Sequence, residues 1–172
     1  MKYMESNQQW SYSPQWEQRL ENWCLQHVGR EKFKDGMDRL RRVLDYQLQR
    51  FMQQKMKVVI VGGSNGKGET VYHLSHLLCA AKIRHALFVS PHVLSVCERI
   101  SVDGELIAYP LLEQRLQREF ARAQDLGQGL SYYELMLAAF FDFVNDRRDP
   151  PLEVCVVEVG LGGQLLITFS KR

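Results

Sequence analysis

The stretch from Val58 to Thr70, VVIVGGSNGKGET, constrains the fold more than any other part of the chain. It begins with a continuous run of apolar β-branched residues, which is typical of a fully buried parallel strand. The glycines that follow permit a turn that other residues would resist. After Lys67, apolar residues recur with helical spacing at Val71, Leu74, Leu77, Leu78 and Ala81. This order of strand, glycine loop, lysine and helix predicts an α/β protein with a phosphate-binding loop.

The glycine loop departs from the strict pattern G-x-x-x-x-G-K-[ST] at two positions. Val61 stands where the first glycine belongs, and Gly68 follows the lysine. The helix start and the Lys67 ammonium would attract a phosphate, whereas the Glu69 carboxylate in the first helical turn would repel one. A glycine-rich turn with a solvated lysine is therefore the alternative to a nucleotide site.

Composition and charge narrow the class of protein. The 172 residues are 45% hydrophobic and 24% charged, as in one globular domain of ordinary size. A net charge of +2 provides no basic field for nucleic acid, and no apolar run is long enough to span a membrane. Four cysteines without a metal-binding or redox spacing favour a reducing cytoplasm. We therefore expect a cytoplasmic protein with no nucleic-acid or membrane partner.

Two further strand ends carry side chains that could hold a metal ion. The apolar run 86–89 leads into Ser90, a proline and His92, and the run 154–157 leads into Glu158. Ligands gather beyond the carboxyl ends of strands in an open parallel sheet, so these side chains would share a crevice with the glycine loop. A hydroxyl and a carboxylate are oxygen ligands that suit Mg²⁺. The alternatives are a loop that simply starts at Ser-Pro and an acid that ends a strand to reach water.

Along the chain, helices are expected before and after the loop-bearing strand. Ser13 and Pro14 suit a helix start as cap and first-turn proline. A second run with helical spacing covers residues 37–51 and leads into the strand. Further along, the sequence Asp103-Gly104 between two short apolar runs predicts a two-residue hairpin.

The segment Ser131–Glu134, SYYE, fits a capping box at the start of a helix. That helix is apolar nearly all round through Val144, so we expect it to be deeply buried. Glu134 therefore has a structural explanation before any functional one.

Five segments together resemble a known family: GGSNGKGE, VSPH, ERISVDGELI, SYYE and EVGLGG. In this order they are similar to folylpolyglutamate synthase/dihydrofolate synthase, within the Mur ligases. The resemblance implies a P-loop ATPase domain with a mainly parallel sheet and flanking helices. It also implies a ligase that uses ATP and Mg²⁺ to phosphorylate a carboxylate and join it to an amine. The implied substrates are dihydropteroate or a folate, and glutamate.

The resemblance also implies roles for particular residues. ATP would contact Gly63, Ser64, Asn65, Gly66, Lys67, Gly68, Glu69 and Thr70. Ser90 and Glu158 match magnesium ligands, and Ser131, Tyr132, Tyr133 and Glu134 match a segment that contacts the pterin-bearing substrate. Lys67 would be the catalytic residue, because it neutralises charge on the transferred phosphoryl group.

Two departures from the family pattern stand out. Glu69 replaces a Ser or Thr, and the segment 164–169 replaces the family's Arg-Leu-Asp-Ala-Thr-Asn. The resemblance implies a helical lead-in over 1–56, part of a P-loop ATPase domain over 57–172, and no carboxy-terminal ligase domain, as after truncation or a frame shift. A full-length family enzyme is expected to be a monomer, whereas this chain is expected to self-associate through an uncovered sheet edge. The competing functions are a non-catalytic nucleotide-binding remnant or interaction module, and another P-loop enzyme such as a small-molecule kinase.

Overall fold

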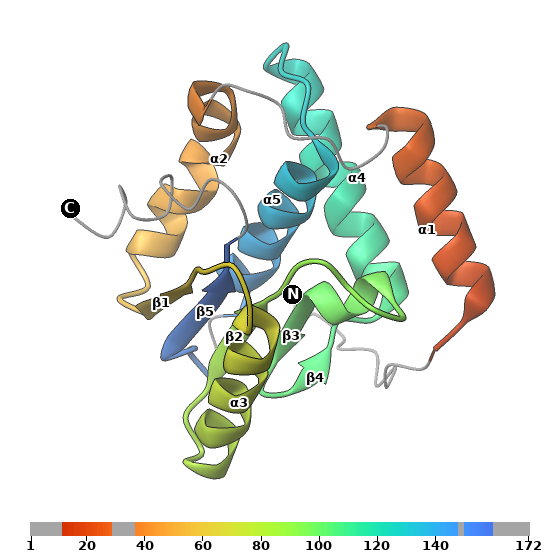
Figure 1. Ribbon diagram of the computed structural model, residues 1–172. Helices are drawn as coiled ribbons and strands as arrows, with labels where there is room; N and C mark the ends of the chain where they lie inside the picture. The colour runs from red at the N-terminus through yellow and green to blue at the C-terminus, as the bar shows by residue number, and fades with distance from the viewer. Residues whose placement is uncertain (1–11, 29–36, 148–149, 160–172) are drawn as a thin grey trace.

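The structure, a computed structural model, describes residues 12–28, 37–147 and 150–159. Strands of these residues form one sheet in the order β1-β5-β2-β3-β4 (Figure 1). The parallel strands are β1 (Lys57–Val61), β5 (Val154–Glu158) and β2 (His85–Phe88). The antiparallel extension consists of β3 (Ile100–Val102) and β4 (Glu105–Leu106). The predicted α/β class with a mainly parallel sheet is confirmed.

Helices cover both faces of the sheet (Figure 1). One face is covered by α3 (Lys67–Ala80), whose Val71 packs with Leu87 and Val156. The other face is covered by α5 (Tyr132–Asn145), against which α2 (Met37–Met52) and α4 (Tyr109–Asp125) pack. The outermost helix, α1 (Pro14–His27), packs on α4. No helix in the described part of the chain is long and apolar enough to cross a membrane.

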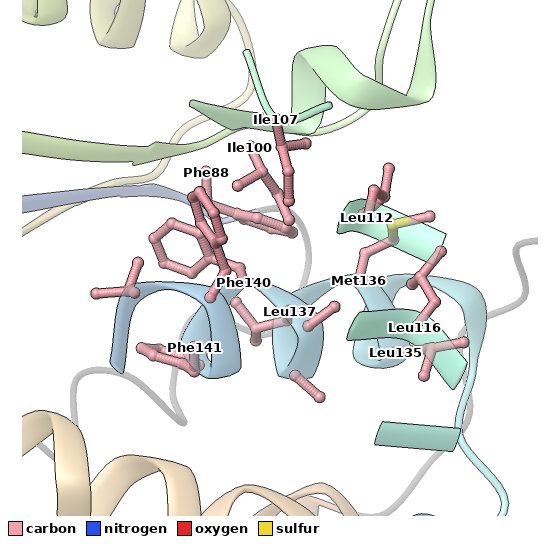
Figure 2. Close-up of a cluster of buried hydrophobic side chains, with 14 of the residues drawn as sticks. Phe88, Ile100, Ile107, Leu112, Leu116, Leu135, Met136, Leu137, Phe140 and Phe141 are labelled. Atoms are coloured by element: carbon pink, nitrogen blue, oxygen red, sulfur yellow. The ribbon is translucent and has the colours of Figure 1, made fainter. Parts of the chain in front are cut away.

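The main core lies between the sheet and α5. Every residue of α5 from Glu134 to Asn145 is buried, as an all-round apolar helix requires. Figure 2 shows Phe88 and Ile100 of the sheet above Phe140 and Met136 of this helix. The aromatic rings of Phe88 and Phe140 lie 5.3 Å apart. Helix α5 therefore packs against strand β2, and together with α2 and α4 it forms the helical layer of the protein.

Short-range signals in the sequence are reproduced by the backbone. Ser13 caps α1 through its side chain, with Pro14 as the first helical residue. Asp103 and Gly104 join β3 to β4 with φ values of 52° and 85°, so both residues of this two-residue turn are left-handed. A short 3₁₀ turn, η1 (Val96–Arg99), precedes β3.

The loop-bearing strand is more exposed than its sequence predicts. Four apolar residues in succession indicate a fully buried strand, yet Val58 is 39% exposed and Val59, Ile60 and Val61 are only half-buried. The reason is the strand order: β1 stands at the edge of the described sheet and pairs with β5 alone. An apolar run cannot by itself distinguish a central strand from an edge strand.

Candidate nucleotide and metal site

The glycine loop joins the carboxyl end of β1 to the start of α3. Its residues from Gly62 to Gly66 are exposed, and Gly66 caps the helix with a φ of 74°. This left-handed conformation is one that glycine adopts without strain. Gly66 carries no side chain that could satisfy the free N–H groups at the helix start. The local backbone therefore presents the donors and the positive helix end that a phosphate requires.

Two side chains of the first helical turn bond back into this loop. The Lys67 ammonium donates a hydrogen bond to the Gly63 carbonyl oxygen at 2.9 Å. The Thr70 hydroxyl donates to the Gly66 carbonyl oxygen at 2.7 Å. Lys67 is therefore folded over the loop, and its contact with a phosphate stays a prediction. Of the other predicted ATP contacts, Ser64, Asn65 and Glu69 are exposed and Gly68 is half-buried.

The predicted metal ligands Ser90 and Glu158 lie next to each other. The Ser90 backbone N–H donates to Glu158 Oε2 at 3.2 Å, and Glu158 is only 4% exposed. Glu158 ends β5 directly opposite Val61, the last residue of β1 before the glycine loop. The three parallel strands thus bring Ser90, Glu158 and the glycine loop together at the carboxyl ends of the strands. Their roles as ligands stay a prediction.

His92 does not join this group. The sequence suggests that it shares the glycine-loop crevice, but its Nδ1 accepts a hydrogen bond from Arg99 Nε at 2.9 Å. Burial and the nearby guanidinium of Arg99 both lower the pKa of His92, which favours the neutral ring. The described contacts of the His92 ring are with Arg99 and with Glu17 and Glu21 of α1.

Glu17, Glu21 and His92 form the one group of three potential ligands found in the described part of the chain, with ligand atoms within 4.8 Å of one another. Their bonding argues against a metal. The Arg99 N–H occupies Nδ1, so a neutral His92 carries its proton on Nε2 and offers no free lone pair. Glu17 already accepts hydrogen bonds from the Val96 N–H at 2.7 Å and from the Tyr109 hydroxyl at 2.8 Å. Glu17 therefore fastens α1 to η1 and to the start of α4.

In the predicted substrate segment Ser131–Glu134, the serine and the glutamate form hydrogen bonds that cap α5. The Ser131 N–H donates to Glu134 Oε2 at 2.6 Å, and the Glu134 N–H donates to Ser131 Oγ at 3.3 Å. The capping box is confirmed, whereas contact with a substrate stays a prediction. The two tyrosines are half-buried: the Tyr132 ring lies under the Arg99 guanidinium, and the Tyr133 ring meets Phe88 edge-on.

Comparison with known proteins gives a consistent picture. The folylpolyglutamate synthase of Arabidopsis thaliana is 33% identical over 141 residues, which cover 77% of this chain and 22% of that protein. The dihydrofolate synthase/folylpolyglutamate synthase of Mycobacterium tuberculosis is 33% identical over 124 residues, 65% of this chain and 25% of that protein. A solved structure of the bifunctional enzyme from Yersinia pestis, complexed with AMPPNP and Mn ion, has a TM-score of 0.71. It is 27% identical, and the match covers 90% of this chain and 36% of that one. No family model matches the chain.

Sheet, glycine loop and strand-end acid together define an α/β fold of the P-loop type found in the Mur ligases. Within that class the chain is placed with the amino-terminal part of the folylpolyglutamate synthase/dihydrofolate synthase family. It spans about a quarter of the length of these curated relatives and about a third of the solved structure.

Proposed function

We propose that the chain is the nucleotide-binding part of an ATP-dependent ligase that adds glutamate to dihydropteroate or a folate. The observation that supports it is the position of Glu158 and Ser90 beside the glycine loop. Solved structures of relatives contain ligands that fit this reaction: Mn, AMPPNP and L-glutamate in one bifunctional enzyme, and DHPP with ADP in the protein from E. coli. In this reaction the terminal phosphoryl group of ATP passes to a carboxylate. The amine then displaces phosphate to form the amide.

The residues at the carboxyl ends of the parallel strands fit the first step, transfer of the phosphoryl group. Lys67 and the free N–H groups of the α3 start would hold the ATP phosphates and offset the charge on the transferred group. Glu158 and Ser90 offer a carboxylate and a hydroxyl oxygen, which are the hard ligands that Mg²⁺ prefers. Bound there, Mg²⁺ would supply further neutralisation of phosphate charge. Tyr132 and Tyr133 would offer aromatic surface to the pterin-bearing substrate.

A test of this function compares two glutamates at opposite ends of β5. Thermal unfolding is followed with ATP and Mg²⁺, and with ATP and EDTA, for the unchanged chain, Glu158→Gln and Glu153→Gln. Glu153 is exposed just before the amino end of the strand, far from the glycine loop, and serves as the control. We expect Mg²⁺·ATP to raise Tm in the unchanged chain and in Glu153→Gln, and Glu158→Gln to lose the Mg²⁺-dependent part. Equal stabilisation of all three proteins would exclude this role for Glu158.

Glu69 favours a second function, a nucleotide-binding module without catalysis. Its exposed carboxylate lies in the first turn of α3, where a negative charge opposes phosphate. Binding of Mg²⁺·ATP with no transfer of its phosphoryl group to any pteroate or folate would favour this module over the ligase.

A further inference from the structure

Arg99 is the largest fully buried side chain of the described residues, with 1% of its surface exposed. Burying a guanidinium is costly unless its charge and its N–H groups find partners. Arg99 ends the 3₁₀ turn η1, outside the glycine-loop site, and no motif of the nucleotide site requires a cation there. Its partners therefore indicate what the buried charge does.

The first partner lies on the loop that follows β2. Arg99 Nε donates to His92 Nδ1 at 2.9 Å, two residues after Ser90. Its neighbour Glu98 holds the same loop from the other side, because its carboxylate accepts hydrogen bonds from the N–H groups of Val93, Leu94 and Ser95 at 2.8, 3.0 and 2.9 Å. Glu98 thus fixes the loop after β2 through the backbone N–H groups of that loop. Arg99 fixes the same loop through the imidazole of His92.

The second partner lies at the start of α5. The Arg99 guanidinium stands 4.8 Å from the centre of the Tyr132 ring, a distance at which cation and ring attract each other. Tyr132 follows the Ser131 cap as the first residue of the helix. One buried side chain thus touches the loop that carries Ser90 and the turn that carries the segment Ser131–Glu134.

We propose that Arg99 is a positioning residue that links the loop after β2 to the first turn of α5. Through this link the position of Ser90 beside Glu158 depends on the packing of Tyr132, and the reverse also holds. Lysine cannot replace it, because an ammonium lacks both the Nε donor geometry and the flat face that lies on the ring. The functional part of the inference rests on the proposed function: the two ends of the link are the metal side and the pterin side of the site.

Amide hydrogen exchange in the 172-residue chain tests the link without any ligand. The reporters are the N–H groups of residues 93–95, which the loop geometry protects. Removing the ring by Tyr132→Leu should speed their exchange about fivefold, which corresponds to one ordinary cation–ring contact. In an Arg99→Lys background the same substitution should have no further effect. Tyr133→Leu is the matched control, because the Tyr133 ring contacts Phe88 instead.

The inference is overturned if Tyr132→Leu leaves these amides unchanged, or if its effect is the same with and without Arg99. Should Arg99→Lys not fold, His92→Leu takes its place, because it removes the other end of the same link. Thermal unfolding with Mg²⁺·ATP then tests the functional part, with Tyr132→Leu expected to weaken the Mg²⁺-dependent stabilisation. A chain that shows the exchange coupling but binds no ATP would refute the proposed function and leave the link standing.

Discussion

The helical layer under the sheet and the glycine-loop edge of the same sheet differ in how much of them is buried. All residues of α5 after its first two are buried, and α2 and α4 pack on it. At the loop edge, β1 is half-buried and the loop residues Gly62–Gly66 are exposed. The difference indicates that folding free energy is concentrated in the helical layer. The loop edge contributes less and keeps its backbone N–H groups available to a ligand.

The largest difference between the two regions should appear in core truncations. Phe140 is fully buried between Phe88 and Phe141, so Phe140→Ala should lower the free energy of unfolding by about 3–5 kcal/mol. Val58→Ala at the exposed edge removes much less buried surface and should cost below about 1 kcal/mol. Urea unfolding measures both. Similar losses would contradict the comparison, because β1 would then carry as much stability as α5.

The helical layer also contains a buried polar network. The Gln47 side-chain amide of α2 donates to Glu119 Oε1 at 2.8 Å and to Asp142 Oδ1 at 3.0 Å. Asp142 is paired further with Arg115 and Arg118. Glu119 Oε2 is buried without a hydrogen-bond partner, and Arg122 Nη1 lies 3.6 Å from the other oxygen, Oε1. The buried charge of Glu119 is therefore only partly compensated.

A pH titration should reveal this charge. Burial, opposed by Arg122 and reinforced by Asp142, raises the pKa of Glu119 from 4.5 to about 7. A carboxyl whose pKa is raised in the folded state stabilises the fold when protonated. The contribution is complete below pH 4.5 and is lost as the pH rises towards 7, by roughly 3 kcal/mol for one group.

Urea unfolding between pH 4.5 and 8 checks the titration, with Glu119→Gln expected to remove that slope. Glu113→Gln is the control, since Glu113 lies on the same helix but pairs with Arg19 towards solvent. A slope that persists unchanged in Glu119→Gln would assign the titration to another group.

The sequence predicts a contact well when the two residues that form it are close together along the chain. The caps at Ser13 and Ser131 and the turn at Asp103-Gly104 depend on residues at most three apart, and all of them appear in the structure. The parallel strand pattern also brings Ser90 and Glu158 together, because the ends of parallel strands meet at one edge.

Long-range partners explain what the sequence does not predict. Gln47 meets Glu119 and Asp142 across 72 and 95 residues of chain, and no local spacing signals these contacts. Glu17 likewise meets Val96 across 79 residues. The edge position of β1 has the same origin, since strand order is set by pairing between distant segments. Local chemistry predicts caps and turns, whereas burial of charge depends on the assembled helical layer.

The smallest effect on binding is expected at Glu69, an exposed residue in the first turn of α3. Its carboxylate is solvated, so it should weaken phosphate binding by only about 1 kcal/mol through its charge near the helix start. Glu69→Ser and Glu69→Gln should therefore both tighten ATP binding about fivefold, as measured by calorimetry. Asp45→Asn on α2 removes an exposed charge elsewhere and should leave the affinity unchanged. Unchanged or weaker binding in both Glu69 variants would mean that the carboxylate points away from the phosphates. A gain in Glu69→Ser alone would instead indicate that the hydroxyl itself contacts phosphate.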